Sequence, residues 1–154
     1  MTRLARLYLA LFVANALAVA AVWWYGLEPT TPAGPAAVLN AVGRLTALVG
    51  TYLLLVQLVL RTHVPWLVSA VGKDRLRTAH TWNAYAAFGL IGTHVVTQIV
   101  GYAVQDRVDL VNEVALLVLH YDGVVTAIVG FALLAGLTIV SLERFRHRIP
   151  WPTW

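Results

Sequence analysis

Residues 78–105 read TAHTWNAYAAFGLIGTHVVTQIVGYAVQ and contain no Asp, Glu, Lys or Arg. Residues 123–142, GVVTAIVGFALLAGLTIVSL, form a second uncharged run. About 20 residues of this kind are enough to span the hydrocarbon core of a bilayer. Because unpaired backbone groups are very costly in lipid, such runs are expected to be helices and not strands. Both stretches therefore predict membrane-spanning helices.

The composition of the whole chain agrees with a lipid solvent. Hydrophobic residues make up 60% of the 154 residues and charged residues 12%, against roughly 45–50% and 25% in an average soluble domain. This balance excludes an ordinary soluble domain. We predict an all-α integral membrane protein that forms a single domain over residues 1–154, a bundle of about four transmembrane helices with approximate spans 7–27, 43–60, 81–103 and 124–142.

The distribution of charge predicts the orientation of these spans. Basic residues cluster before the first span, between the second and third, and after the fourth, at Arg3, Arg6, Arg61, Lys73, Arg75, Arg77, Arg144, Arg146 and Arg148. Since cytoplasmic loops carry an excess of Lys and Arg, both termini are expected in the cytoplasm, for a multi-pass protein of the plasma or inner membrane. The net charge of +4 is explained by this topology and by anionic lipid. The bilayer is thus an expected partner, and nucleic acid is not.

The sequence also limits the chemistry that the protein can carry. It contains no cysteine, which excludes disulfides, thiolate metal sites and cysteine-ligated iron–sulfur clusters. It contains neither of the glycine-rich motifs that bind phosphates of nucleotides. Any redox centre must therefore use other ligands.

Two histidines lie in the third predicted span region. His80 and His94 are fourteen residues apart, which in a helix is roughly 40° from the same face and about 21 Å along the axis. The residues that share this face are mostly small or apolar, and such a face can admit a flat macrocycle: Ala84, Ala87, Ile91, Gln98 and Gly101. Imidazole is a normal axial ligand of haem iron. A histidine in a span can equally lie among lipid headgroups or hydrogen-bond to a neighbouring helix.

Part of the sequence resembles a known family. The stretch from Gly43 to Tyr102, most specifically VPWL at 64–67 and GKDRLRTAH at 72–80, resembles the ferric reductase-like transmembrane domain of bacterial, actinobacterial-type oxidoreductases, which are distant relatives of NADPH oxidases. The resemblance implies two b-type haems between the third and fifth helices, each helix supplying two histidines about a dozen residues apart. His80 and His94 match the third-helix pair and are the implied haem-iron ligands.

The sequence departs from the family pattern after Arg148. There it reads IPWPTW, which resembles the approach to a fifth helix, and the second histidine pair is not found. His120 is predicted at the outer end of the fourth span, His147 in a basic tail and His63 in the inner loop, so none replaces that pair. Modules for FAD and NAD(P)H are also missing. We therefore expect an incomplete ferric reductase-like domain that works with a flavin reductase module or partner chain, or in a homodimer or with a complementing subunit.

The resemblance implies a function, although whether this chain is itself an enzyme is left open. It implies a haem-binding membrane domain that passes electrons from a cytoplasmic flavin and NAD(P)H reductase to an outer acceptor such as ferric iron or oxygen. Arg44 is a candidate partner of a haem propionate, with snorkelling to headgroups as its alternative. Gln98 is a candidate hydrogen-bond partner of haem, and Trp82 a candidate packing residue at a haem edge. The alternative from another class is a non-catalytic membrane subunit or scaffold without a cofactor.

Overall fold

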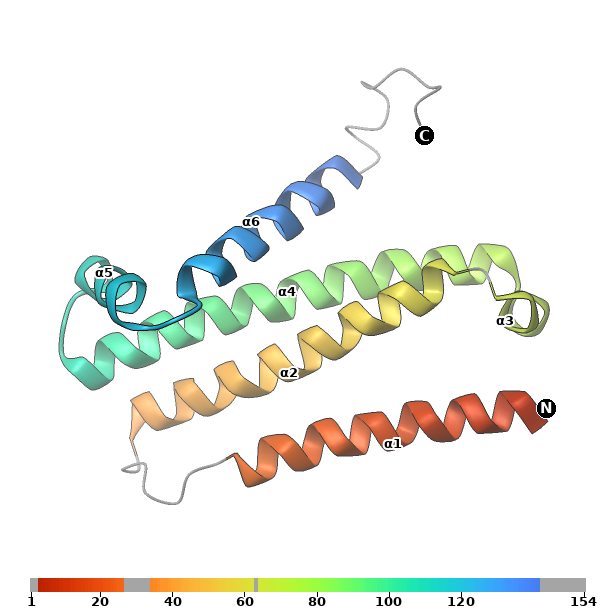
Figure 1. Cartoon of the computed structure of the whole chain (residues 1–154), viewed down its shortest axis with the longest axis horizontal. Helices are drawn as coiled ribbons and strands as arrows, with labels where there is room; N and C mark the ends of the chain where they lie inside the picture. The colour runs from red at the N-terminus through yellow and green to blue at the C-terminus, as the bar shows by residue number, and fades with distance from the viewer. Residues whose placement is uncertain (1–2, 27–33, 63, 142–154) are drawn as a thin grey trace. The chain divides into compact units, whose positions relative to one another are not determined.

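The protein is helical wherever the structure describes it. The computed structural model describes residues 3–26, 34–62 and 64–141, and in these ranges it contains no strand. The helices are α1 Arg3–Tyr25, α2 Pro35–Arg61, α3 Pro65–Val71, α4 Lys73–Asp106, α5 Leu110–His120 and α6 Val124–Ser141 (Figure 1). They fall into two units, residues 1–107 with α1 to α4 and residues 108–154 with α5 and α6, and each unit is described by itself. The predicted all-α class is confirmed.

Three of the helices, α2, α4 and α6, are long and apolar enough to cross a membrane. The first predicted span also forms a helix, α1, but its described apolar part, Ala10–Tyr25, is shorter. Among the described residues the membrane character is therefore carried by three candidate spans, with α1 as a fourth, shorter apolar helix. The predicted integral membrane protein is confirmed.

Two helices start well before their predicted spans. α2 begins at Pro35 and not near 43, since proline suits the first helical position, where its missing N–H costs nothing. α4 begins at Lys73 and not near 81, and Asp74 in its first turn suits the positive end of the helix dipole. At 34 residues, α4 is about 51 Å long, more than the roughly 30 Å of hydrocarbon it has to cross. Hydropathy detects only the part of a helix that lies in lipid, so it misses a first turn that carries charged residues. His80, which precedes the predicted span 81–103, therefore lies inside α4.

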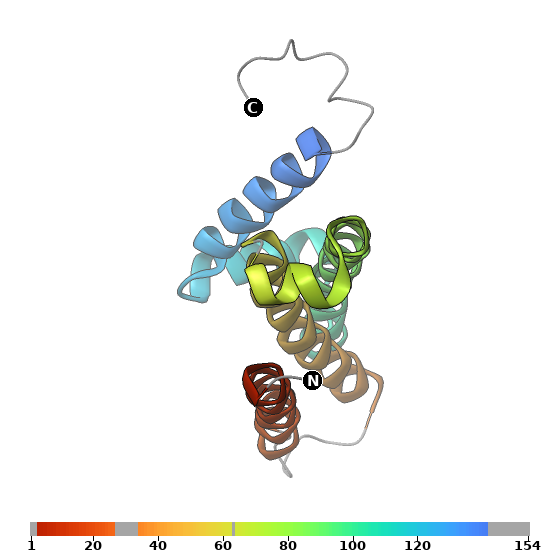
Figure 2. The ribbon, with the colours of Figure 1, turned by 90° about the vertical axis from the view of Figure 1, so that its right-hand side faces the viewer.

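The connection between α2 and α4 contains the short helix α3 and a turn at Gly72. Pro65 begins the short helix α3, and Gly72 ends it with φ 90°, a backbone conformation that favours glycine. After this turn α4 runs back alongside α2, as both views show (Figures 1 and 2). The two helices form an antiparallel pair.

Small residues allow α2 and α4 to approach closely. Gly43 and Gly50 on α2, and Ala87 and Gly101 on α4, are all buried. They recur at multiples of seven residues, the period at which a left-handed helix pair keeps one face toward its partner. Membrane helices rely on such small residues for close packing, because lipid supplies no hydrophobic drive between them. This seam is the core of the first unit.

The helix α1 lies along α2 in the same unit. The indole Nε1 of Trp23 donates to the Ala41 carbonyl at 3.2 Å, near one end of the contact. Toward the other end, the Tyr52 hydroxyl donates to the Phe12 carbonyl at 3.1 Å, and the two rings lie 5.2 Å apart between centroids. These contacts place the end of α1 near the first turns of α2.

The second unit begins with a capped helix. The carboxylate of Asp109 accepts from the N–H groups of Val111 and Asn112, at 3.0 and 3.1 Å, and so caps α5. These bonds, the Asn112 N–H first among them, hold the pKa of the Asp109 carboxyl below its ordinary value. Leu110–His120, α5, is a short apolar helix of 11 residues.

Candidate cofactor site in the helix pair

His94 is held by the backbone of the facing helix. Its Nδ1 lies 2.9 Å from the Gly43 carbonyl oxygen. Because a carbonyl oxygen only accepts, Nδ1 must donate, which leaves the lone pair of the neutral ring on Nε2. Gly43 permits this approach, since a Cβ there would lie 2.8 Å from Thr97 Oγ1 and collide with the Gln98 amide. The ring thus has a fixed tautomer and orientation.

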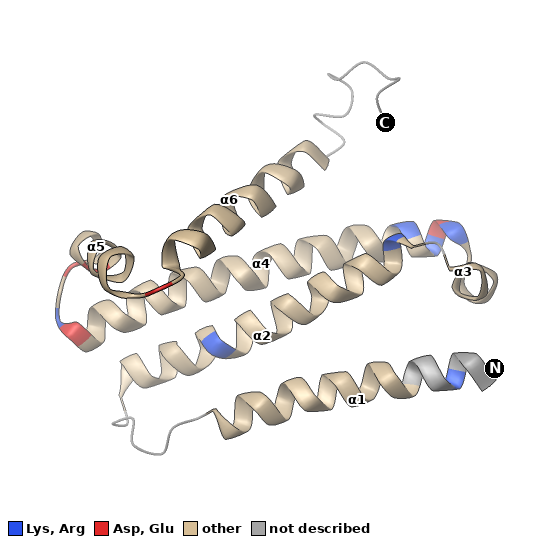
Figure 3. Ribbon diagram, in the orientation of Figure 1, with Lys and Arg blue, Asp and Glu red and all other residues tan. Residues whose placement is uncertain are grey.

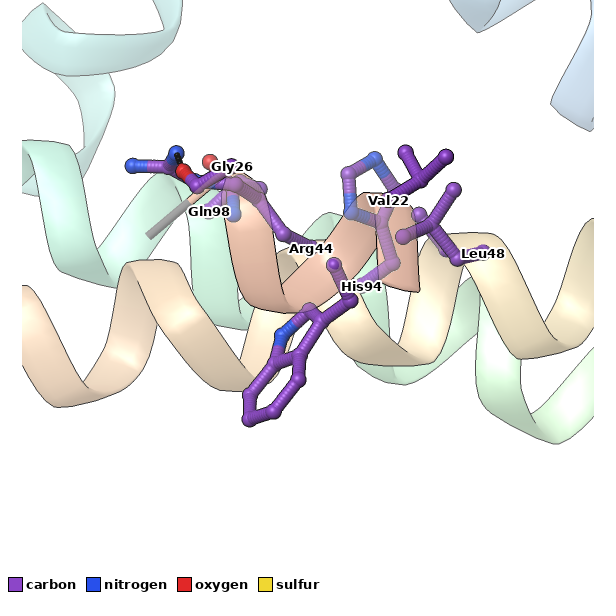
Figure 4. Close-up of a pocket in the computed structure, with 8 residues that line it drawn as sticks. Val22, Gly26, Arg44, Leu48, His94 and Gln98 are labelled. Atoms are coloured by element: carbon purple, nitrogen blue, oxygen red, sulfur yellow. Dashed lines mark hydrogen bonds between the residues drawn. The ribbon is translucent and has the colours of Figure 1, made fainter. Parts of the chain in front are cut away.

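A pocket of about 350 Å³ opens beside His94, between α1, α2 and α4. This volume is at the lower end of the range for small-molecule sites, roughly 300–1,000 Å³. Most of its wall is apolar, and three polar side chains reach it, from Arg44, His94 and Gln98 (Figure 4). Its full lining is Val22, Trp23, Gly26, Arg44, Ala47, Leu48, His94 and Gln98.

The two polar neighbours of His94 are also anchored to backbone. Arg44 Nη1 donates to the Gly26 carbonyl at 2.6 Å, which ties α2 to the end of α1. Gln98 Nε2 donates to the Asn40 carbonyl at 3.1 Å. The structure therefore brings together three of the residues singled out from the sequence, Arg44, His94 and Gln98. Whether they bind a cofactor stays a prediction.

His80 has a different environment, made of side-chain amides. Its Nε2 lies 3.1 Å from Gln57 Nε2, and the same amide nitrogen donates to the His80 carbonyl at 3.0 Å. Asn83, one turn further along α4, donates to Gln57 Oε1 at 2.7 Å and to the Leu53 carbonyl at 2.8 Å. His80 is thus part of a polar contact between α2 and α4.

The face of α4 that carries both histidines packs on α2. Ala87, midway between them, is completely buried, so the small residues of this face accommodate a helix along much of their length. Trp82 is 70% exposed and lies edge-to-face with Tyr85, their centroids 6.2 Å apart. It does not line the pocket beside His94, and its predicted role at a haem edge stays a prediction.

Four residues of these contacts were not singled out from the sequence: Trp23, Asn40, Gln57 and Asn83. Gln57 and Asn83 carry a signal that was available, since a polar side chain inside an apolar span indicates a functional or packing role, whereas Asn40 precedes the predicted span 43–60. Trp23 gave no such signal, because a tryptophan near a span end usually anchors at the interface.

The other histidines lie elsewhere. His120 is exposed on α5, with Nδ1 3.1 Å from the Leu116 carbonyl, and His63 and His147 fall outside the described residues. Within the described ranges, no three His, Asp or Glu side chains gather as ligands for a bare metal ion.

The comparison with known families agrees with a membrane-spanning chain. The model of the family described as ferric reductase like transmembrane component matches residues 46–154, more than two thirds of the chain. The chain belongs to this family. Neither a curated protein nor a solved structure gives a significant match. In this ferric reductase-like chain the matched stretch includes His80, His94 and Gln57, whereas α1 and Arg44 precede it.

The family implies haem, and the two histidines differ in how well they fit one. His94 could hold the iron of such a group, because its Nδ1–H is on a carbonyl and the lone pair of the ring is on Nε2. Arg44 beside it offers a charge for a carboxylate. At His80, Nε2 is in contact with the Gln57 amide, so this ring does not present that atom to a metal as it stands. The residues around His94 fit the group, and those around His80 do not in this arrangement.

Proposed function

We propose that this ferric reductase-like chain is the haem-binding membrane domain of a transmembrane oxidoreductase. The observation that carries the proposal is His94, whose Nδ1 is fixed on the Gly43 carbonyl at the edge of a pocket that also contains Arg44 and Gln98. When bound, haem supplies reversible one-electron chemistry at iron. The fixed tautomer of His94 would then provide a ligand that needs no reorganisation.

The surrounding residues would orient the cofactor and shield it. Arg44 uses one N–H on the Gly26 carbonyl, and a guanidinium has five N–H donors in all, so the same side chain is suited to a propionate. Gln98, anchored on the Asn40 carbonyl, has a second N–H for a polar edge of the group. Trp23 and Leu48 would add apolar contacts at the wall of the pocket.

The direction of electron transfer in this proposal follows from the distribution of charge. In the first unit, Lys and Arg gather where α2 ends and α4 begins, and Asp106 lies at the opposite end of α4 (Figure 3). By the positive-inside rule the basic end faces the cytoplasm, with both termini, in the plasma or inner membrane. His94 and Arg44 then lie nearer the outer side. Electrons would enter from a cytoplasmic flavin and NAD(P)H reductase and leave to an acceptor such as ferric iron or oxygen.

The proposal requires ligands from outside these residues. A complete domain holds two haems of b type and needs a second histidine pair, and the five histidines of this sequence supply one pair at suitable spacing. In this proposal the opposing ligands come from residues outside this pair, a second copy or a complementing chain among the sources, with the flavin reductase module as a further partner.

The second candidate is a membrane subunit that binds no cofactor. The observation in its favour is the contact between His80 and Gln57, because a histidine bonded to a neighbouring helix can serve packing alone. It assigns no role to the pocket beside His94, which is why we favour the first proposal.

A reduced-minus-oxidised absorbance spectrum of the detergent-purified chain separates the two candidates. We expect a b-type signal that falls strongly in His94→Ala, because the variant removes the ligand. His120→Ala is the matched control, since this histidine is exposed on α5 and outside the helix pair, and it should keep the full signal. A wild-type chain that is folded by circular dichroism and takes up no haem, alone or with its partner, would refute the haem proposal and favour the packing subunit.

A further inference from the structure

The two histidines of α4 meet α2 through different ring nitrogens, His94 through Nδ1 and His80 through Nε2. His94 meets a backbone carbonyl, which can only accept. His80 meets a side-chain amide, which can donate or accept depending on which end faces the ring. The orientation of the Gln57 amide therefore determines which nitrogen of His80 carries the proton.

The neighbours of Gln57 fix that orientation. One donor of the Asn83 amide is held by the Leu53 carbonyl at 2.8 Å, which places the NH₂ group of Asn83 toward α2. The same NH₂ group lies 2.7 Å from Gln57 Oε1, so an oxygen is needed there. The other end of the Gln57 amide lies 3.0 Å from the His80 carbonyl, so a nitrogen is needed there. A flipped amide would set donor against donor at Asn83 and acceptor against acceptor at the His80 carbonyl.

It follows that the second N–H of Gln57 points to His80 Nε2, which accepts it at 3.1 Å. A neutral imidazole has one acceptor nitrogen and one N–H, so Nδ1 carries the proton. Nε2 holds the lone pair that a metal would use, and the Gln57 amide already occupies that lone pair.

We propose that Gln57 is a positioning residue that competes with haem iron for Nε2 of His80. As a result, the haem site at His94 is filled before the haem site at His80. This inference rests on the proposed haem function. Haem ligation at His80 requires the Gln57 amide to rotate away and to give up its bonds to Asn83 and to the His80 carbonyl. No such exchange is needed at His94, where the carbonyl of Gly43 takes the other nitrogen.

The tautomer of His80 can be read without any cofactor. The ¹⁵N chemical shifts of its ring, measured by NMR on the haem-free full chain, should report a proton on Nδ1 and an unprotonated, hydrogen-bonded Nε2. In Gln57→Met, which keeps the length of the side chain and removes the amide, the hydrogen-bond shift at Nε2 should disappear. A proton on Nε2 in the wild-type chain would overturn the inference, whatever the chain does with haem.

Competition is measured by haem titration in a His94→Ala background, in which only the haem site at His80 keeps its histidine. Since a net hydrogen bond is worth about a factor of 2 to 12 in an equilibrium constant, Gln57→Met should raise the affinity for haem b by roughly that factor, and Asn83→Leu, which frees the amide to rotate, should raise it less. Gln105→Met is the matched control: this glutamine lies at the far end of α4, where its Oε1 accepts from Asn40 Nδ2 at 3.4 Å, so the variant also removes an amide from the helix pair but should leave the haem affinity at His80 unchanged.

The outcomes distinguish this inference from the function on which it rests. If haem binds and Gln57→Met leaves the affinity equal or lower, the competition is refuted and the haem function stands. If no variant takes up haem, the haem function fails, and the inference fails with it as a statement about cofactor loading. If haem fills the site at His80 before the site at His94 in the wild-type chain, the proposed order is wrong.

Discussion

The seam between α2 and α4 makes a sharp prediction at Gly50. A Cβ added there would lie 2.8 Å from Ile91 Cγ1 and 3.4 Å from the Ile91 backbone nitrogen. Real Cβ atoms do not approach so closely, so Gly50→Ala must push the two helices apart or force Ile91 from its rotamer. Overpacking of this kind costs about 1–3 kcal/mol.

A second glycine isolates that cost from the effect of helix propensity. Gly89 is exposed on α4, and a Cβ there would meet nothing within 4 Å. Replacing glycine by alanine in a helix interior stabilises by about 0.5–1 kcal/mol at both positions. Gly89→Ala should therefore gain this amount, and Gly50→Ala should unfold about 1–3 kcal/mol more easily than Gly89→Ala.

The assay is reversible unfolding of the purified full chain from mild-detergent micelles by added SDS, followed by circular dichroism. The double variant Gly50→Ala with Ile91→Ala should recover part of the loss relative to the sum of the single variants, because the colliding Cγ1 is gone; this coupling is measured by a double-mutant cycle. If Gly50→Ala and Gly89→Ala agree within about 0.5 kcal/mol, the close approach of α2 and α4 at this level is refuted.

Three further predictions concern other parts of the chain. Trp23→Phe removes an indole N–H bonded to the backbone of α2 and should lower the free energy of unfolding by about 0.5–1.5 kcal/mol in the same assay. Trp82→Phe, at a side chain 70% exposed, should stay within about 0.5 kcal/mol of wild type. Equal losses in the two variants would contradict the placement of α1. Arg44→Ala removes the bond to the end of α1 and should speed hydrogen exchange in residues 22–26 while leaving the middle of α4 unchanged; unaltered exchange in 22–26 would argue against that tie. The pKa of the Asp109 carboxyl is lowered by folding, so its stabilisation of α5 is complete above the ordinary pKa of about 3.9 and is lost as the pH falls through the lowered folded value. Amide exchange in the first turn of α5, corrected for intrinsic rates, should therefore rise only below about pH 4. Asp109→Asn, which caps without titrating, should remove that dependence, and a rise already near pH 6 would contradict the prediction.

Much of the fold could be predicted from local patterns. The uncharged runs 78–105 and 123–142 correspond to α4 and α6, because lipid leaves a long apolar segment few alternatives to a helix. The helix ends could not be predicted in the same way. Residues 35–42 and 73–80 are helical through Pro35, Asp74 and packing against a neighbour, none of which a hydropathy window detects.

The candidate site could be predicted in part. Arg44, His94 and Gln98 meet at one pocket, which is consistent with the spacing on α4 and with the place of Arg44 in the second span. Trp82 could not be placed by proximity in sequence to His80, because two residues along a helix turn a side chain to another face. The wall supplied by α1 depends on Trp23 reaching the backbone of α2, a contact between residues 18 apart.

The sequence by itself determined that this is an all-α membrane protein with two imidazoles at two depths of one helix, because hydrophobicity and helical period are local properties of the chain. Only the tertiary structure decided what each imidazole offers. His94 faces a carbonyl and keeps its Nε2 lone pair, whereas His80 faces the Gln57 amide and has that lone pair occupied. The physical reason is that the hydrogen-bond partner across the interface decides which ring nitrogen is occupied, and that partner depends on the register of α2 against α4.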